Sequence, residues 1–424
     1  MKYINSLLKS PIVKNLSIFV SGTALAQLIV IGFQVVLRRI YSPEDFGAFA
    51  LYMSVVGIVA TISSFRYEQA IILPKENTIG QNILKLSILL SLITFVLLLI
   101  TFVLLDNQIV SIINFPVQYQ NWLYFIPISI LLFSISQSFN FYLIRIKRFK
   151  LSASNKLFRR TSEGIIQSLF GMFHRSFGLF VGDIVGQLTV IVRTVLKTKD
   201  SFNFKIDLSE LKIAAKRYKS FPLKNGIPSL MNALSLLLPI IIINRQFNEE
   251  VTGYFDLARM VLIIPLSLIT ASLSQVIFQR FSEKRNQKQS IKKEAWGIFI
   301  SLIILALFFA IIIQFFGVYL FQFVFGIQWG SSGAYASILV WAFALKFVIS
   351  PFNILFTAFE KIEILSIWQT FYFILILLLN YIPFVSIEHF LWAYVIIELI
   401  SYSIAGLLNI GLIVKYERSI INSR

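Results

Sequence analysis

The sequence contains no cysteine and only two histidines, His174 and His389, among its 424 residues. Disulfide bonds, metal–thiolate sites and lipid attachment to a cysteine are therefore excluded. Two histidines are also too few for a histidine-rich metal centre. A glycine-rich phosphate loop ending in Gly-Lys-Ser or Gly-Lys-Thr is missing, so we do not expect the chain to hydrolyse ATP itself. We expect no metal, no cofactor and no catalytic residue.

Charged residues are scarce as well. They make up 14% of the chain, and 57% of the residues are hydrophobic, whereas soluble domains average roughly a quarter charged residues. Soluble cores could not bury so much apolar surface, because a folded surface needs polar residues to face water. The composition excludes a soluble enzyme, a disordered tail and a secreted disulfide scaffold, and it indicates a membrane protein.

Long apolar runs, separated by charged or Pro/Gly-rich breaks, define the predicted architecture. A membrane-spanning helix needs about 20 mainly apolar residues. We predict an all-α membrane protein with about twelve such helices, of which the fifth is unusually polar because it contains Arg159, Arg160 and Glu163. The predicted spans are 15–37, 45–68, 83–105, 122–144, 153–173, 177–196, 221–243, 252–278, 295–316, 332–358, 362–384 and 389–414.

The positive charge indicates how these helices are oriented. Lys and Arg number 38 against 20 Asp and Glu, which gives a net charge of +18. Cytoplasmic loops of membrane proteins carry an excess of basic residues, and here the loops 145–160, 197–220 and 280–293 are rich in them. We expect both termini in the cytoplasm, attraction to anionic membrane lipids and no nucleic-acid partner. The predicted outer loops hold few basic residues, namely Arg38, Arg39, Arg175 and Arg245.

An ungapped repeat relates the two halves of the chain. At an offset of 206 residues the second predicted span superposes on the eighth. Six spans in each half give both halves one membrane orientation, as in transporters built from parallel repeats. We predict two pseudo-symmetric six-helix bundles, 1–196 and 221–424, around a central cavity, with a cytoplasmic linker over 197–220. Matched positions include Arg39 with Arg245, Glu44 with Glu250, Gly47 with Gly253 and Gln69 with Gln275.

Ionisable residues inside the predicted spans are the candidate functional groups. A charge at mid-bilayer costs about 2.5–3.5 kcal/mol on the insertion scale, so it usually faces a cavity or a partner. Cations in both halves favour a cavity for an anion. Snorkelling and salt bridges, such as an Asp256–Arg259 pair, are the structural alternatives. Substrate-binding candidates are Arg66, Lys224, Arg259 and Lys346, and ion-coupling candidates are Glu163, Asp183, Asp256 and Glu398.

The acidic pair Glu44 and Asp45 in the first outer loop suggests a different class, a membrane-embedded glycosyltransferase or ligase. Ser42-Pro43-Glu44 is more typical of a helix start, with a serine N-cap, proline at the first position and acids at the positive end of the helix dipole. The predicted outer loops are also too short for a substantial catalytic loop. We therefore favour the helix start.

The seventh predicted span contains Pro222, Pro228 and Pro239 together with Gly226. Each proline removes a backbone donor and favours a kink. We expect a bent helix here, which suits alternating access by rocking of two bundles.

Several segments resemble one family. YSPEDFGAFAL (41–51) and RYEQAIILPKE (66–76) resemble the first helices of bacterial lipid-linked oligosaccharide flippases, which transport O-antigen and capsule repeat units. FPLKNGIPSLMNALSLLLP (221–239), TGYFDLARMVLIIP (252–265) and SQVIFQRFSE (274–283) are similar to the family's seventh and eighth helices. The family belongs to the superfamily of multidrug, oligosaccharidyl-lipid and polysaccharide exporters. Arg66, Glu68 and Arg259 occupy its motif positions, whereas Lys346 and Glu398 match no motif.

The resemblance implies a transporter and not an enzyme. Its substrate would be an oligosaccharide on undecaprenyl diphosphate, moved from the cytoplasmic to the periplasmic leaflet of the bacterial inner membrane during polysaccharide or lipopolysaccharide biosynthesis. A polysaccharide polymerase and chain-length machinery are the implied protein partners. Because the chain has no phosphate loop, we expect its energy to come from an ion gradient or from the substrate's own gradient. A cation-coupled multidrug exporter of the same fold is the alternative, and it would depend on acids more than on bases.

Overall fold

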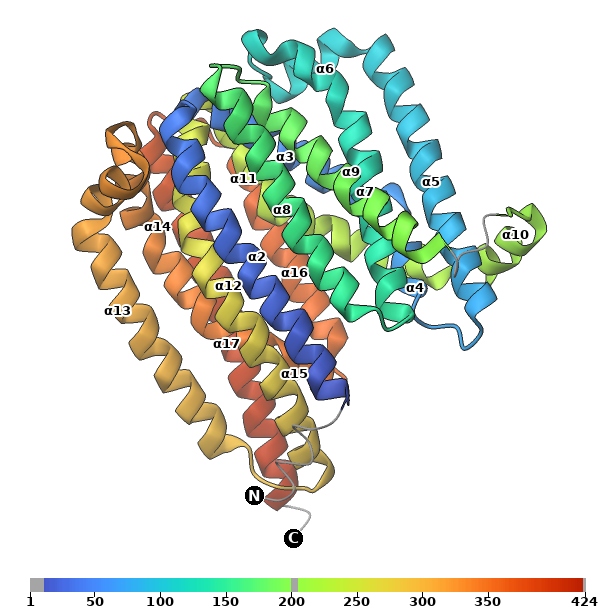
Figure 1. Ribbon diagram of the computed structural model, residues 1–424. Coiled ribbons are helices and arrows are strands. Elements are labelled where there is room, and N and C mark those ends of the chain that lie inside the picture. Colours follow the sequence, from blue (N-terminus) through green and yellow to red (C-terminus); the bar gives the residue numbers. More distant parts are fainter. Residues whose placement is uncertain (1–10, 200–204, 422–424) are drawn as a thin grey trace. The chain divides into compact units, whose positions relative to one another are not determined.

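The computed structural model describes residues 11–199 and 205–421, which form helices and turns and no strand (Figure 1). Each of the twelve predicted spans coincides with a long helix or with a run of consecutive helices. Ten of these segments are long and apolar enough to cross a membrane, and the other two expected spans are α2 and α8. The chain is therefore an all-α, multi-pass membrane protein, as its composition predicts.

The contacts divide the chain into two compact units, residues 1–237 and 238–424, and the division falls inside α11. The helices up to this point are α2 (Pro11–Ile40), α3 (Pro43–Ser63), α4 (Tyr67–Ala70), α5 (Asn77–Leu104), α6 (Asp106–Ile113), η1 (Val117–Phe125), α7 (Ile126–Arg145), α8 (Phe149–Met172), α9 (Gly178–Thr198), α10 (Leu208–Arg217), η3 (Phe221–Asn225) and α11 (Gly226–Gln246).

The remaining helices form the C-terminal unit. They are α12 (Glu249–Asn286), α13 (Lys292–Phe325), η4 (Ile327–Trp329), α14 (Gly330–Ile349), η5 (Ser350–Asn353), α15 (Ile354–Ala358), α16 (Ile362–Leu378), η6 (Leu379–Tyr381) and α17 (Ile387–Ile421).

The same pattern of neighbouring helices occurs inside each unit, as the internal repeat predicts. In the N-terminal unit α7 packs against α3, α5 and α9, and α8 pairs with α9. In the C-terminal unit α14 packs against α12, α13 and α17, and α16 pairs with α17. The fourth helix of each repeat is thus its central element. The expected central cavity and the boundaries at 196 and 221 stay predictions.

Two helix starts explain the strongest part of the repeat. Ser42 caps α3 in a capping box, in which its hydroxyl accepts from the Asp45 backbone and the Asp45 carboxylate accepts from the Ser42 backbone. Asp45 also accepts a 2.6 Å hydrogen bond from Tyr119. Asn248, which is 206 residues after Ser42, caps α12 through the Val251 backbone at 2.9 Å. The helix-start interpretation of residues 42–44 is confirmed.

Two of the predicted spans, 45–68 and 332–358, are interrupted in the structure. α3 ends at Ser63, because Phe65 and Arg66 adopt left-handed backbone angles, with φ values of 52° and 64°. Arg66 therefore lies between two helices and not inside the second span. α14 ends at Ile349, where the 3-10 turn η5 with Pro351 precedes α15, because proline has no N–H to continue the helix.

The segment 197–220, expected as a linker, contains a helix in its described part. α10 buries Leu211 and Ala214 and packs against α5. Asp207 caps this helix, and the hydrogen bonds that it accepts from the Ser209 hydroxyl and backbone hold the pKa of Asp207 below its usual value. The prediction that both termini lie in the cytoplasm concerns residues 1–10 and 422–424, which are outside the described residues.

Candidate functional site

A buried ion pair lies in the C-terminal unit. The ammonium of Lys346 on α14 lies 3.5 Å from a carboxylate oxygen of Glu398 on α17, and these side chains are 19% and 1% exposed. The same oxygen accepts hydrogen bonds from the hydroxyls of Tyr372 and Tyr394, at 2.6 and 2.7 Å. Within the described part of the chain, the second carboxylate oxygen has no hydrogen-bond partner. The structure thus joins two residues that the sequence assigns to different roles.

Aromatic rings surround the Lys346 ammonium. It lies 5.0 Å from the ring centre of Tyr402 and 5.9 Å from that of Tyr372. Phe343 is at 5.7 Å, and the Trp368 ring stacks on Tyr372. Ring faces attract cations, most strongly where water is excluded. These rings and Glu398 together keep a charged lysine in the apolar interior of this unit.

A second cation lies near this pair. Arg259 on α12 is half-buried, and its charge acts on both Lys346 and Tyr394. Among the described residues no carboxylate lies within ion-pair distance of Arg259. Asp256, on the preceding turn of α12, is half-buried as well. This region of the C-terminal unit therefore holds two basic groups close to one carboxylate.

Two of the ion pairs in the N-terminal unit involve α8. Arg159 lies 3.3 Å from Asp183 on α9, and the Asp183 side chain is 1% exposed. Arg160 lies 2.9 Å from Glu163 on the same helix. Both acids that the sequence offers for ion coupling in this half are thus neutralised by arginines. Neither arginine was among the substrate-binding residues predicted from the sequence.

A polar cavity of about 450 Å³ lies next to these pairs, between α2, α7, α8 and α9. Basic groups of Lys156, Arg159 and Arg160 line one wall. Gln187 is fully buried, and in the described part of the chain both polar atoms of its amide lack a hydrogen-bond partner, as does Nε of Arg159. Other polar lining residues are Gln27, Ser136, Gln137, Asn140, Ser152 and Asn155. The cavity offers cations and amides to a ligand.

The spacing of these basic residues is a sequence signal that we missed. Lys156, Arg159 and Arg160 lie three and four residues apart, so a helix places them on one face. The sequence does not say whether that face meets a cavity or the membrane surface. Packing of α8 against both α2 and α9 decides this.

Arg66 and Lys224, the remaining predicted substrate-binding residues, do not line this cavity. Arg66, at the break after α3, lies 3.4 Å from Glu68, which also accepts a hydrogen bond from the Ser64 hydroxyl. Lys224 is exposed on the π-helical turn η3. Over the described ranges, no group of three or more acidic or histidine side chains could hold a metal ion.

Comparison with solved structures defines the fold. The chain is similar to the lipid II flippase MurJ in an inward closed conformation, with a TM-score of 0.74, 12% identity and coverage of 95% of this chain and 90% of MurJ. It is also similar to an inward-facing multidrug resistance MATE family transporter of the MOP superfamily, with a TM-score of 0.71, 14% identity and coverage of 92% and 95%. A MOP superfamily transporter from Pyrococcus furiosus gives a TM-score of 0.58 at 14% identity, with 95% of each chain covered. The protein has the fold of the MOP superfamily transporters.

The sequence identifies the family. Residues 36–334 match the family described as polysaccharide biosynthesis protein, and the chain belongs to this family. A comparison with curated proteins gives no match. The family and the fold class predicted from the sequence are confirmed.

Proposed function

We propose that the protein is a flippase for lipid-linked oligosaccharides. It moves repeat units on undecaprenyl diphosphate from the cytoplasmic to the periplasmic leaflet of the inner membrane by alternating access. Transport precedes polymerisation of the repeat units, so a polysaccharide polymerase with its chain-length machinery is the proposed consumer of the product. The protein forms and breaks no covalent bond of its substrate.

The cation-lined cavity of the N-terminal unit carries this proposal. Three basic side chains face it, and no carboxylate is among the described residues that line it. A diphosphate is a dense anion, and arginine binds phosphate oxygens through two parallel hydrogen bonds. The amides and hydroxyls of the same cavity can donate to and accept from sugar hydroxyls. The cavity therefore matches both parts of the proposed headgroup.

The C-terminal cations extend this assignment. We propose that Arg259 and Lys346 bind phosphate or acidic sugars during part of the cycle, and that Arg66 and Lys224 assist at the membrane surface. Glu163, Asp183, Asp256 and Glu398 are the proposed ion-coupling groups. Three of these acids form ion pairs with basic residues, so a proton or a sodium ion that binds there would compete with a lysine or an arginine.

A cation-coupled multidrug exporter is the second candidate. The similarity to a MATE family transporter and the buried carboxylates of Asp183 and Glu398 favour it. A cationic drug requires carboxylates that face it, whereas the described lining of the polar cavity holds three basic residues and no carboxylate. The flippase is therefore the stronger proposal.

The test uses purified protein in liposomes that contain a fluorescent polyprenyl-diphosphate oligosaccharide. An impermeant reagent that modifies the sugar measures how fast the lipid reaches the outer leaflet. We expect saturable acceleration over empty liposomes. Lys156→Gln combined with Arg160→Gln should reduce the rate at least tenfold, whereas Lys150→Gln, on an exposed part of the same helix, should leave it unchanged.

Two results would contradict the proposal. The first is a folded protein that accelerates neither this lipid nor the lipid-linked unit of its own host. The second is transport of a cationic dye that depends on Asp183 or Glu398, which would identify the drug exporter instead.

A further inference from the structure

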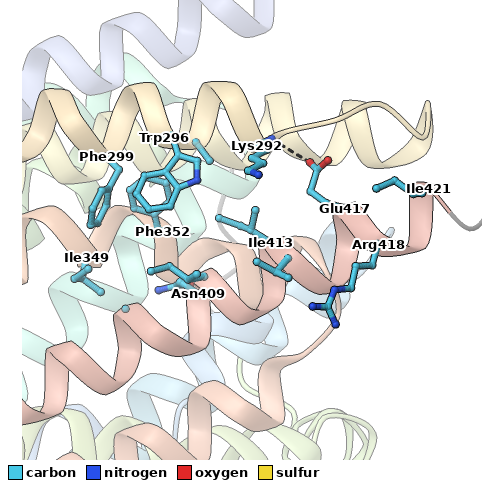
Figure 2. A pocket seen from close by; sticks show the side chains of 14 residues that line it. Lys292, Trp296, Phe299, Ile349, Phe352, Asn409, Ile413, Glu417, Arg418 and Ile421 are labelled. Carbon is cyan, nitrogen blue, oxygen red and sulfur yellow. Dashed lines mark hydrogen bonds between the residues drawn. The ribbon is translucent and has the colours of Figure 1, made fainter.

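An apolar groove of about 390 Å³ lies between α13 and α17 in the C-terminal unit. Trp296 and Phe299 of α13 form one side, and Ile413 of α17 and Phe352 of η5 also line it (Figure 2). The groove is separate from the Lys346–Glu398 pair, because none of the residues of that cluster lines it. The proposed transport function gives it no role.

The groove is charged at one end. Lys292, Glu417 and Arg418 lie together there, and Phe299 and Ile349 lie toward the opposite end (Figure 2). Lys292 is the first residue of α13, and Arg418 lies in the last turn of α17. A ligand in this groove would therefore meet charged groups at one end and, apart from Asn409, apolar side chains over the rest.

Glu417 has a hydrogen-bonding role of its own at this end of the groove. One of its carboxylate oxygens accepts hydrogen bonds from the backbone N–H groups of Ile291 and Lys292, at 2.8 and 3.0 Å, and from the Ser290 hydroxyl at 3.0 Å. The carboxylate thus caps the N-terminus of α13. Over the described residues, no carboxylate lies within ion-pair distance of the Lys292 ammonium or the Arg418 guanidinium. Both side chains are exposed and can bind an anion.

The length of the groove matches one membrane leaflet. Its lining on α17 extends from Gly406 to Ile421, which corresponds to roughly 22 Å at 1.5 Å per residue. A bilayer with its headgroup regions is about 40–45 Å thick, so one leaflet occupies about half of that. The Trp296 indole lies one turn from Lys292, as expected for a tryptophan at the membrane–water interface. The charged end therefore fits the headgroup level and the apolar part fits the acyl chains.

We propose that this groove binds an anionic phospholipid of the surrounding membrane. The phosphate lies between Lys292 and Arg418, and an acyl chain follows the apolar wall from Trp296 toward Ile349. Lys292 and Arg418 with the single carboxylate of Glu417 leave a net positive charge at the end of a mainly apolar channel. This charge favours a lipid with net negative charge over a zwitterionic lipid, whose own ammonium would be repelled. The site is one of lipid binding and is independent of the transported substrate.

Native mass spectrometry of the purified full-length protein tests this site. Phosphatidylglycerol and phosphatidylcholine are added at equal concentrations, and retained lipid is counted per protein molecule. We expect at least threefold more phosphatidylglycerol than phosphatidylcholine on the wild type. The double variant Lys292→Ala, Arg418→Ala should lose this preference. The matched control Lys293→Ala, Lys415→Ala removes the same charge from the same helices outside the groove and should keep it.

A second variant tests the apolar part. Val414→Trp fills the groove at a position that is 42% exposed, so it should reduce retention of phosphatidylglycerol without lowering the melting temperature. Equal loss in both double variants, or no preference for phosphatidylglycerol in the wild type, would overturn the proposal. Retention of a second copy of the chain, lost in Val414→Trp, would also overturn it and would assign the groove to a dimer contact.

Discussion

The Lys346–Glu398 pair can be taken apart one charge at a time. Removing one member of a buried pair leaves the other charge uncompensated, at a cost of about 3–5 kcal/mol. We expect a cost near the lower end of this range, because the Lys346 side chain is 19% exposed and water can partly solvate it. We expect Glu398→Leu to lower the melting temperature of the purified protein in detergent. Lys346→Met together with Glu398→Leu should restore most of that loss.

The double variant also separates structure from function. If Lys346 binds the anionic headgroup, Lys346→Met, Glu398→Leu should fold and still transport lipid-linked oligosaccharide at least tenfold more slowly than the wild type in the liposome assay. Normal transport by the stable double variant would limit the pair to a structural role. A variant that neither folds nor recovers would show that the tyrosine hydroxyls around Glu398 require the carboxylate itself.

The sequence identifies some functional residues but not the residues that they contact. Lys346 and Glu398 are identifiable from the sequence, because charges inside apolar runs are costly and rare. Their pairing is not identifiable, because α14 and α17 are separate helices and only packing brings them together. Arg66 illustrates the opposite case. The predicted second span includes it, but the left-handed backbone at Phe65 and Arg66 takes it out of the helix. Neither position carries the glycine or proline that would indicate a break.

At the scale of helices, α13 and α14 approach each other closely at Gly317 and Gly333. A Cβ at Gly333 would lie 2.5 Å from Cα of Val318 and 2.6 Å from the backbone oxygen of Gly317. Backbone atoms cannot move aside as side chains do, and overpacking typically costs about 1–3 kcal/mol. We expect Gly333→Ala to lower the melting temperature. Gly297→Ala on α13 is the control, because its Cβ would have no neighbour within 4 Å and alanine favours helix by up to about 1 kcal/mol.

Arg145 at the end of α7 holds the loop before α5. Its guanidinium donates to the backbone oxygens of Ile71, Pro74 and Glu76, at 2.9, 2.7 and 2.6 Å. A lysine has no planar fork with which to bind three acceptors. We expect Arg145→Lys to loosen the loop, so that trypsin cleaves after Lys75 several-fold faster in the purified protein, as measured by mass spectrometry.

The control for this loop is Lys150→Gln, which changes an exposed cation on the adjacent helix. Cleavage after Lys75 should proceed at the wild-type rate in that variant. An equal rate in Arg145→Lys would mean that the loop is held by other contacts.

Helix positions were largely predictable, whereas helix ends were not. Apolar runs identify the part of a helix that needs lipid or a core, and each of the twelve runs falls on a helix or on consecutive helices. The observed α12, α13 and α17 extend beyond the predicted spans, because helical hydrogen bonds continue into polar flanks that hydropathy does not detect. The capping residue Ser42 is the exception, since a cap is a local signal that the sequence carries in full.

At the scale of the whole molecule, charge distinguishes the two candidate functions. The sequence shows that cations outnumber acids, but it does not show which cations face a cavity. The structure places three in the polar cavity of the N-terminal unit, and all three come from the helix whose polarity made the fifth span unusual. The composition thus shows the excess of positive charge, whereas the packing of α8 determines which basic side chains face the cavity.

Asp183→Asn discriminates between the two functions in one protein. Asp183 is 1% exposed and neutralises Arg159 at 3.3 Å, so its amide variant keeps the volume and leaves the arginine charge free for a ligand. A charge-assisted hydrogen bond contributes about 1.5–3 kcal/mol, and part of this gain should appear as tighter binding. For a flippase we therefore expect inorganic diphosphate to bind the purified variant at least threefold more tightly than the wild type, measured by calorimetry. Asp207→Asn, on the exposed cap of α10, should bind diphosphate like the wild type. For a cation exporter the same Asp183→Asn change removes a substrate or coupling carboxylate, so diphosphate affinity would not rise and transport of a cationic dye would be lost.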